Sequence, residues 1–454
     1  MPDHAAPGSA QTRSFWLEAY GDYRAEPPLE GDVRADVAIL GGGFTGLSTA
    51  WHLKRLKPSL DVVVVEGDEI GYGASGRNGG FSMTLFGFEP DMTTMLYGLE
   101  RARAAHRYME DAVDYVRDLV AGQGMDSHYE HNGFARLSLT KVHEARLRKQ
   151  YELYGKWGFA GSFAWWDRRR VGEEVTSPLF RGGFYEPRCG ILDPARQVRE
   201  WKRLCLEAGV VVHEHSPVAR IGYDSFGATL HTGHGSVRAE RIVLATNAYS
   251  HLLPEMGGFS RRQVPVWTYQ IATEPLSEAQ WAAIGWQRRF GIETNRHLVH
   301  YFRPTADGRI AFGGADVRLA YGKAMDRDSH PPTWRTLERH LKAMFPPLKD
   351  VAIACRWGGP VSLTLDMTPN LGFWRDERTL YLLGCAGHGV SLTQYSGLTL
   401  AELALGIESS RTHVWFVNRK PVSWPPEPLR SVAAHTIHAA LRAEDAFRER
   451  GLWK

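Results

Sequence analysis

The stretch from Asp36 to Glu66 most constrains what this chain can fold into. An apolar run comes first, followed by the glycine-rich hexapeptide 41–46, a helix-like run and a second apolar run ending at Glu66. The hexapeptide fits G-x-G-x-x-G, in which the first glycine permits a tight turn, the second lets a pyrophosphate approach and the third lets the helix pack on the strand. The pattern predicts a strand, turn, helix and strand that bind a dinucleotide at the helix N-terminus.

The acidic residue at the end of this unit narrows the choice of cofactor. Glu66 stands 20 residues after Gly46, where a carboxylate accepts hydrogen bonds from ribose hydroxyls. An acid at this position argues against a 2′-phosphate, so FAD or NAD fits better than NADP. The residues of the turn expected to contact the cofactor are Gly41, Gly43, Phe44, Thr45 and Gly46.

Composition limits the remaining function classes. The chain has 454 residues, enough for two or three domains, and its 54 basic and 51 acidic side chains nearly balance. This balance favours neither nucleic acid nor an anionic membrane as a partner. The sequence contains neither a long apolar run nor a signal-like N-terminus, so we expect neither membrane insertion nor export. Four cysteines lie far apart without a C-x-x-C, so we expect small buried thiols in the cytoplasm and no metal site.

A second glycine-dense segment, 70–81, follows Glu66. Its five glycines would weaken a helix or a strand, and such backbone suits close approach to a flat or phosphate-bearing ligand. A flexible loop is the alternative interpretation. The residues expected near the cofactor are Gly73, Ala74, Ser75, Arg77, Asn78, Gly79 and Gly80.

The middle of the chain alternates between helix-like and strand-like sequence patterns. Residues 92–122 have the amphipathic pattern of one long helix, and His106 and His143 stand among charged residues, which predicts solvated side chains. A helix is expected from Asp193 as N-cap, then strands that include Val218, and a buried strand that runs into a turn at Asn247. Such a strand end is where doubly wound sheets bind ligands. Val218 and Asn247 are further residues expected to contact the cofactor. Residues 264–273, 297–302 and 309–312 predict an antiparallel, aromatic-rich block.

A second strand, glycine turn and helix appears near the C-terminus. Strand 379–383 precedes a turn and a helix that runs to Leu405. The dipole at this second helix N-terminus would favour negative charge on a bound cofactor. The turn residues expected to contact it are Gly387, His388, Gly389, Val390 and Ser391. The tail from Trp424 is proline-rich and then helical.

These motifs together resemble the D-amino-acid-oxidase-like superfamily of FAD-dependent amine oxidoreductases, most of all its gamma-glutamylputrescine oxidase group. The resemblance covers roughly residues 14–410. It implies an α/β (α+β) fold with a discontinuous, Rossmann-like, glutathione-reductase-like FAD-binding domain and an inserted antiparallel β-rich substrate domain. The implied boundaries are 1–90, 184–255 and 355–423 for the FAD-binding parts, 91–183 and 256–354 for the substrate parts, and 424–454 for a helical tail.

The resemblance also implies the chemistry. A C–N bond of a small amine is oxidised to an imine by hydride transfer to FAD, the imine is hydrolysed, and O2 or another acceptor reoxidises the flavin. Members with covalent flavin use a Cys before the Thr-x-Asp stretch or a His in the loop, whereas this chain has Gly358-Gly359-Pro360 and Arg77-Asn78. We therefore expect non-covalent FAD. Sarcosine oxidases carry a substrate-binding Lys at the position that matches Ser391 here, which favours an amine over an α-amino acid.

Five residues are candidates for the catalytic site. Trp357 precedes a double glycine and suits an apolar wall for a neutral amine. His388 either faces flavin and substrate or shapes its turn. Tyr269 and Tyr301 either line the substrate face or pack across strands, and Arg303 either binds an acidic group or forms an ion pair.

Three functions stay open at this point. The first is an FAD-dependent oxidase or dehydrogenase of a primary or secondary amine. The second is an FAD enzyme acting on a D- or N-alkyl amino acid. The third is a flavin-binding subunit without turnover of its own. An NAD-dependent dehydrogenase is disfavoured by the C-terminal glycine turn, and no oligomeric state follows from the sequence.

Overall fold

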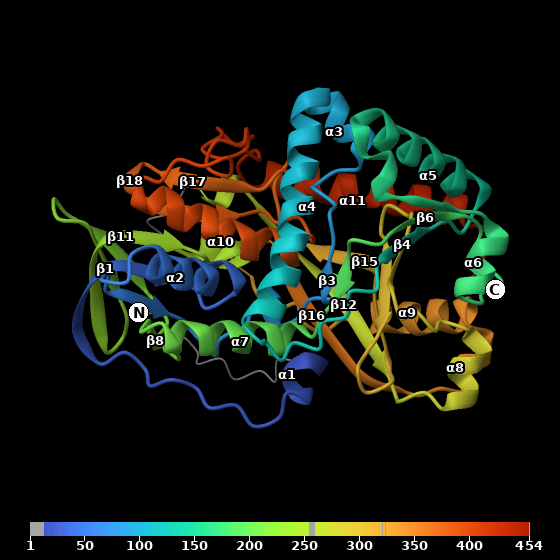
Figure 1. Cartoon of the computed structure of the whole chain (residues 1–454), viewed down its shortest axis with the longest axis horizontal. Helices are drawn as coiled ribbons and strands as arrows, with labels where there is room; N and C mark the ends of the chain where they lie inside the picture. Colours follow the sequence, from blue (N-terminus) through green and yellow to red (C-terminus); the bar gives the residue numbers. More distant parts are fainter. Residues whose placement is uncertain (1–12, 254–258, 320, 323, 454) are drawn as a thin grey trace.

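Two eight-stranded sheets form the two halves of the molecule (Figure 1). The computed structural model describes residues 13–253, 259–319, 321–322 and 324–453. The first sheet lies on the left of Figure 1 and the second on the right. The first sheet is built on parallel strands joined by helices and the second is mostly antiparallel, so the α/β (α+β) expectation is confirmed.

The first sheet is built on parallel strands. Its order is β17-β18-β11-β1-β2-β8, and β10 and β9 extend it from β11. The strands are β1 (Gly31–Leu40), β2 (Val62–Val65), β8 (Val211–His213), β9 (Arg220–Tyr223), β10 (Ala228–His231), β11 (Gly235–Leu244), β17 (Asn370–Trp374) and β18 (Asp376–Leu383). Strands β1, β2, β8, β11 and β18 pair in parallel. Their apolar runs fit a sheet that is covered on both faces.

Three helices pack together against this sheet. They are α2 (Phe44–Leu56), α7 (Pro194–Glu207) and α10 (Gly389–Leu405). Asp193 caps α7 by accepting from the Arg196 N–H at 3.0 Å, as expected. The Ser48 hydroxyl of α2 donates to the Gln394 carbonyl of α10 at 2.6 Å, so the helices after the two glycine turns touch directly.

The second sheet is almost entirely antiparallel. Its strands in order are β16 (Ile353–Leu363), β12 (Val264–Thr273), β15 (Ile310–Leu319), β14 (His300–Pro304), β13 (Gly291–Thr294), β4 (Phe134–Leu137), β6 (Gly183–Glu186) and β5 (Ala164–Trp166). Only the pair β13 and β4 within it is parallel. One face forms a core with α8 (Glu278–Ile284) and α9 (Pro331–Met344). Strand β16 crosses the boundary expected at residues 354 and 355 and pairs with β12.

The expected long helix at 92–122 is two helices. Gly98, with φ of +80°, separates α3 (Pro90–Tyr97) from α4 (Leu99–Gly122), and α4 lies between the two halves (Figure 1). The expectation that His106 is solvated was wrong. Its ring is buried against Phe159 and Tyr154, because helix neighbours in sequence point to other faces. The helices α5 (Lys141–Tyr154) and α6 (Arg168–Glu174) follow along the chain.

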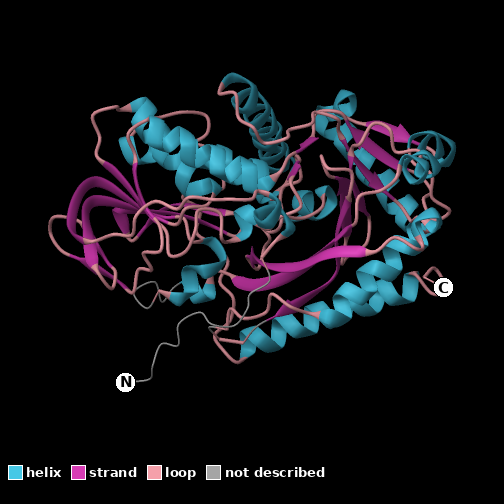
Figure 2. Ribbon diagram, turned by 90° about the horizontal axis from the view of Figure 1, so that it is seen from below, coloured by secondary structure: helices cyan, strands magenta, loops and turns pink. Residues whose placement is uncertain are grey.

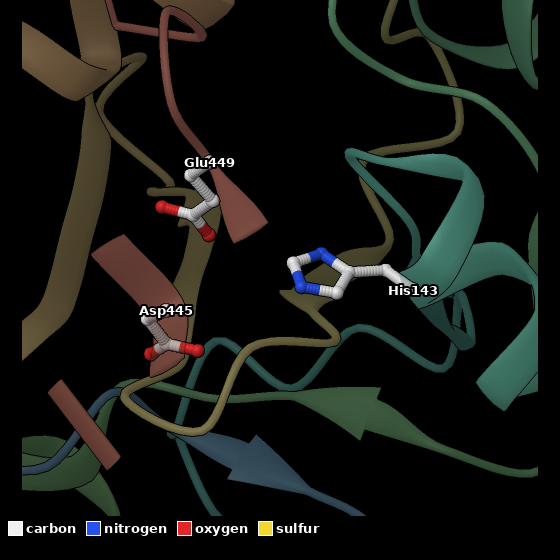
Figure 3. A group of neighbouring side chains, drawn as sticks. All are labelled: His143, Asp445 and Glu449. Atoms are coloured by element: carbon white, nitrogen blue, oxygen red, sulfur yellow. The ribbon is translucent and has the colours of Figure 1, made fainter. Parts of the chain in front are cut away.

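The expectation for His143 was wrong in the same way. His143 is buried, and burial lowers its pKa to about 4. Figure 3 shows its imidazole directed at Asp445 and Glu449, whose ligand atoms lie within 4.8 Å of those of His143. These carboxylates already have donors, since Arg296 bonds Glu449 at 2.6 Å and the His297 and Leu298 N–H groups bond Asp445. The group therefore attaches the tail to the second half.

The tail itself ends in α11 (Leu429–Arg448). Figure 2 shows a long helix running along the second half toward the C-terminus. The remaining short elements are α1 (Phe15–Ala19), β3 (Phe81–Ser82) and β7 (Gly190–Ile191). All four cysteines are free, and Cys189, Cys205 and Cys385 are buried as expected, while Cys355 is half-buried. Among the described residues, no helix has the length and apolarity needed to cross a membrane.

Candidate active site

The first glycine turn leaves no room for side chains. Gly41 has φ of +112°, and a Cβ on Gly46 would lie 2.0 Å from the Gly41 carbonyl oxygen. Gly43 is the N-cap of α2 and supplies no side-chain cap. The Phe44 N–H bonds only the Ser75 hydroxyl, at 3.0 Å. Among the described residues, the Thr45 and Gly46 N–H groups have no hydrogen-bond partner. The turn therefore offers two open N–H groups and the positive end of a helix dipole, which is what a pyrophosphate requires.

Glu66 lies at the carboxyl end of β2, beside this turn. Its carboxylate accepts from the Gly42 N–H at 2.6 Å and from the Asp68 N–H at 3.0 Å. Burial, more than any other cause, raises the pKa of Glu66. The carboxylate thus fixes the turn and stands where a ribose would bind.

Replacing Glu66 with alanine removes both of these hydrogen bonds. We expect the dissociation constant of FAD to rise by about 10- to 100-fold, from the loss of bonds to a charged acceptor. Equilibrium dialysis against FAD measures this change. An unchanged dissociation constant would show that Glu66 does not contact the cofactor.

The second glycine-rich segment is held by its own hydrogen bonds. Residues Ala74–Gly76 form a 3₁₀ turn. The Asn78 amide donates to the Ala74 and Ser75 carbonyls, both at 3.0 Å, and its oxygen accepts from the Gly80 N–H at 2.7 Å. A Cβ on Gly80 would lie 2.0 Å from the Leu192 carbonyl oxygen. These contacts favour a fixed structure over the flexible-loop alternative.

Arg77 joins this segment to the second sheet. Its guanidinium is 3% exposed and donates to the Tyr72 carbonyl at 2.8 Å and the Gly358 carbonyl at 3.1 Å. Its own carbonyl accepts from the side chains of Gln270 at 2.7 Å and Trp357 at 3.0 Å. Segment 77–81 therefore runs across the face of the second sheet that is turned away from α8 and α9.

The C-terminal glycine turn completes the edge of the first sheet. His388 is the N-cap of α10 and supplies no side-chain cap, so this helix N-terminus is also open. Asn247, in the turn that follows β11, accepts from the Gly384 N–H at 3.2 Å, and the Ser391 hydroxyl bonds that of Ser82 at 2.8 Å. Val218 packs partly buried against the core of this sheet.

The residues present fit an FAD. Two open helix N-termini, α2 and α10, are brought to the carboxyl ends of β1, β2, β11 and β18, the edge where such sheets bind nucleotides. The glycines of the first turn have no side chains, so a ligand can approach the backbone there.

A cross-sheet row of side chains shares the face of the second sheet under segment 77–81. Direct pairing in the strand register puts its members on one face, because residues opposite one another across strands point the same way. In order they are Trp357, Gln270, Gly313, Tyr301, Glu293, Arg136, Phe184 and Trp165. This row is the wall that the second sheet presents to the nucleotide half.

Two tyrosine candidates lie on opposite faces of the sheet. Tyr301 is in the row and packs edge-to-face on Phe81 at 5.9 Å between ring centres. A Cβ on Gly79 would lie 3.2 Å from its ring, and burial raises its pKa to about 12. Tyr269 points into the core with α9, and its hydroxyl donates to the Arg327 carbonyl at 2.7 Å.

Trp357 and Arg303 lie together beside α1. Trp357 is fully buried against Phe15 and Trp16. Arg303 is 3% exposed, its guanidinium lies 4.5 Å from the Trp16 ring centre, and burial lowers its pKa to about 10. Within the described part of the chain, Arg303 donates no hydrogen bond. These two residues flank segment 77–81 at Arg77 and Gly80.

Sequence reasoning missed an ionic cluster in the row. Arg136 bonds Glu89 through both guanidinium NH groups, one at 2.6 Å, and bonds Glu293 through Nε at 3.0 Å. Glu89 and Arg136 are also the charges that act on His388. Burial raises the pKa of Glu293 to about 7. The available signal was an acid, Glu293, inside the short strand β13.

Comparison with known proteins identifies the family. The model for DAO, FAD dependent oxidoreductase, matches residues 36–403. Gamma-glutamylputrescine oxidoreductase of Escherichia coli K12 is 32% identical over 398 residues, covering 87% of this chain and 89% of that protein. Glycine oxidase of Bacillus licheniformis is 24% identical, covering 82% of this chain and 94% of that protein.

Solved structures share the fold. The crystal structure of glycine oxidase from Geobacillus kaustophilus has a TM-score of 0.71 at 20% identity and covers 83% of this chain and 96% of that chain. L-proline dehydrogenase from P. horikoshii gives a TM-score of 0.70 at 20% identity, covering 84% and 96%. The expected resemblance is confirmed over most of the chain. This protein belongs to the DAO family of FAD-dependent oxidoreductases.

Proposed function

We propose that this enzyme oxidises the C–N bond of a polar primary or secondary amine to an imine, which water hydrolyses to a carbonyl product. The substrate resembles gamma-glutamylputrescine, the compound named in the Escherichia coli relative. When bound, FAD supplies the two-electron acceptor for this oxidation.

One observation of the site carries the choice of an amine. Arg136 is the cation of the cross-sheet row, and its donors are already used by Glu89 and Glu293. Within this row, no Arg or Lys of the described residues has donors left for the carboxylate of an α-amino acid, and Arg303, which donates no hydrogen bond, lies outside the row beside α1. The row has Glu293 next to Tyr301 instead, which suits a substrate that arrives as a cation.

His388 and Tyr301 suit the handling of such an amine. Burial lowers the pKa of His388 to about 4, so its ring is neutral at pH 7. Its Nδ1 is buried and has no hydrogen-bond partner among the described residues. The raised pKa of Tyr301 keeps that phenol protonated as a donor. Neutral groups of this kind orient a deprotonated amine, the form that can lose hydride.

A substrate panel tests this function. We expect purified enzyme to release aldehyde and ammonia from gamma-glutamylputrescine with kcat/KM at least about 100-fold above that for glycine or sarcosine, since an unmatched buried group costs several kcal/mol. Coupled assays for both products measure the ratio. A preference for the amino acids would establish the second of the functions left open by the sequence.

We also infer that FAD is held without a covalent bond. The loop position has Arg77 and Asn78, and strand β16 has Gly358 and Gly359, so neither offers a nucleophile. We expect acid precipitation of the yellow protein to leave a yellow supernatant and a colourless pellet. A pellet that keeps its colour would establish a covalent link.

A further inference from the structure

We propose that Arg303, together with the indole N–H of Trp16, binds a carboxylate beside the cross-sheet row. The inference rests on the proposed function in one respect, because we take this carboxylate to be the acid end of a gamma-glutamyl amine. A free carboxylate from solution has the same chemistry and is the other possible source. Arg303 is a binding residue in this account, and no proton or hydride transfer is assigned to it.

Arg303 is a buried cation whose donors are unused. Its side chain is 3% exposed, and among the residues that the structure describes it forms neither a hydrogen bond nor an ion pair. Burial lowers its pKa to about 10, so the guanidinium is still charged at pH 7. A guanidinium has five N–H donors. Buried charged groups are normally paired, so a missing acceptor points to a ligand.

Trp16 adds a second free donor at the same place. The centre of its ring lies 4.5 Å from the Arg303 Cζ, and its Nε1 is buried without a partner in the described part of the chain. The helix α1 that carries Trp16 is fixed, since the hydroxyl of its N-cap Ser14 donates to the Gly76 carbonyl at 2.6 Å. Both unfilled groups are donors, so the ligand that suits them is an acceptor.

The residues packed around Arg303 supply no polar side chain to it. Ala311 is opposite Arg303 on β15. Segment 77–81 approaches the guanidinium with Gly80, where a Cβ would lie 3.1 Å from the Arg303 Nη2. A carboxylate has two acceptor oxygens in one plane, which matches the planar fork of a guanidinium.

Charged neighbours act on Arg303 only from a distance. Asp193 attracts it most strongly, followed by Glu130, and Arg289 repels it. The Asp193 carboxylate caps α7 by accepting from the Arg196 N–H at 3.0 Å, and Glu130 bonds Arg289 at 2.8 and 2.9 Å. These acids balance charge in the region, but their oxygens are engaged elsewhere and leave the N–H donors of Arg303 unfilled.

The position of Arg303 on β14 selects the kind of substrate. Arg303 follows Tyr301 by two residues, so both side chains are on one face of the strand, about 7 Å apart along it. In an α-amino acid the carboxylate and the amine share one carbon, which is too short to join the two residues. The acid at the end of a gamma-glutamyl chain is far enough from the reacting amine.

The first test compares gamma-glutamylputrescine with its α-carboxamide, in which a neutral amide replaces the carboxylate and the reacting amine is unchanged. We expect kcat/KM to be about 10- to 100-fold higher for the carboxylate, because it accepts hydrogen bonds from a charged group. The difference should lie in KM, with similar kcat, since this contact is the same before and during the reaction.

Arg303→Met should remove this preference while keeping the flavin spectrum, and Arg303→Lys should retain part of it. Trp16→Phe keeps the aromatic ring, removes the N–H and should reduce the preference by about 2- to 10-fold. The last two variants test the site even where Arg303→Met does not fold.

Arg289→Met is the matched control. Arg289 lies in the same region, but its guanidinium is already bonded to Glu130 and, at 3.0 Å, to the Thr305 carbonyl. We expect this variant to keep the wild-type preference for the carboxylate.

A second test is independent of turnover. Thermal unfolding of the FAD-loaded enzyme is followed in acetate and in acetamide, its neutral isostere, at constant ionic strength. We expect acetate to raise the unfolding midpoint by about 2 °C in the wild type and in Arg289→Met, and not in Arg303→Met.

The outcomes separate this site from the proposed function. A wild type that neither prefers the carboxylate nor responds to acetate overturns the inference, as does an Arg303→Met enzyme that keeps both effects. A substrate preference lost in Arg303→Met supports the site with the substrate as its source. An acetate response through Arg303 without that preference supports a site for free carboxylates. The same response in an enzyme that oxidises no amine supports the site and refutes the proposed function.

Discussion

Gly46→Ala is expected to yield protein without FAD. The added Cβ would lie 2.0 Å from the Gly41 carbonyl oxygen and 3.2 Å from Ile39. Both neighbours belong to the turn or its strand, so α2 must move away from the nucleotide edge. We expect the dissociation constant of FAD to rise by at least about 10-fold, because a 1.4 kcal/mol change in binding free energy already gives that factor, and the flavin absorbance per purified protein to fall with it.

Gly122→Ala is the matched control for this change. Gly122 ends α4, and nothing lies within 4 Å of a Cβ built there. This variant should keep its flavin and gain slightly in stability. Full flavin content in Gly46→Ala would contradict the role of the glycine turn.

Arg136→Met is expected to lower the free energy of unfolding by about 3–5 kcal/mol at pH 8. It leaves the buried Glu293 and the half-buried Glu89 without the cation that pairs with both of them, and breaking a buried pair costs this much. Urea denaturation followed by circular dichroism measures the loss.

The pH dependence of this loss has a definite sign. The pKa of Glu293 in the folded wild type is already raised to about 7, and removing the guanidinium raises it further. A raised carboxyl pKa means that the folded state binds protons that the unfolded state releases. The defect should therefore be largest at pH 8 and shrink as the pH falls toward 5.5.

Two further variants test whether the buried cluster causes the loss of stability in Arg136→Met. Arg117→Ala removes an arginine paired with Asp114 and Asp118 on an exposed helix face, with 34% of its side chain exposed, and should cost under about 1 kcal/mol. Adding Glu293→Gln to Arg136→Met should restore part of the stability. Equal losses in Arg136→Met and Arg117→Ala would show that the cluster is not buried as described.

Local patterns in the sequence predicted the nucleotide half well. Residues 36–66 form β1, the turn, α2 and β2 because contiguous residues carry the glycine spacing, the apolar runs and the acid. The C-terminal turn was recognisable for the same reason. The prediction that Asp193 is the N-cap of α7 was correct, because capping depends only on residues in the first helical turn.

The substrate half was harder because its wall is assembled from distant strands. The cross-sheet row joins residues from Arg136 to Trp357, and the register that aligns them is not encoded in any one strand. Alternation within β12 and within β14 identified two sets of side chains on each strand but not which set faces the cofactor, so Tyr269 on β12 and Tyr301 on β14 were equivalent in the sequence. His106 and His143 were misjudged because charged sequence neighbours are not spatial neighbours.

Anaerobic mixing of the yellow enzyme with gamma-glutamylputrescine tests the central claim most directly. The flavin band near ~450 nm reports reduction without any assumption about the later electron acceptor. We predict complete bleaching by the amine, with glycine and sarcosine leaving the band unchanged over the same time. A band that the amino acids bleach and the amine does not would contradict the account, and a band that no substrate bleaches would point to a flavin-binding subunit without turnover.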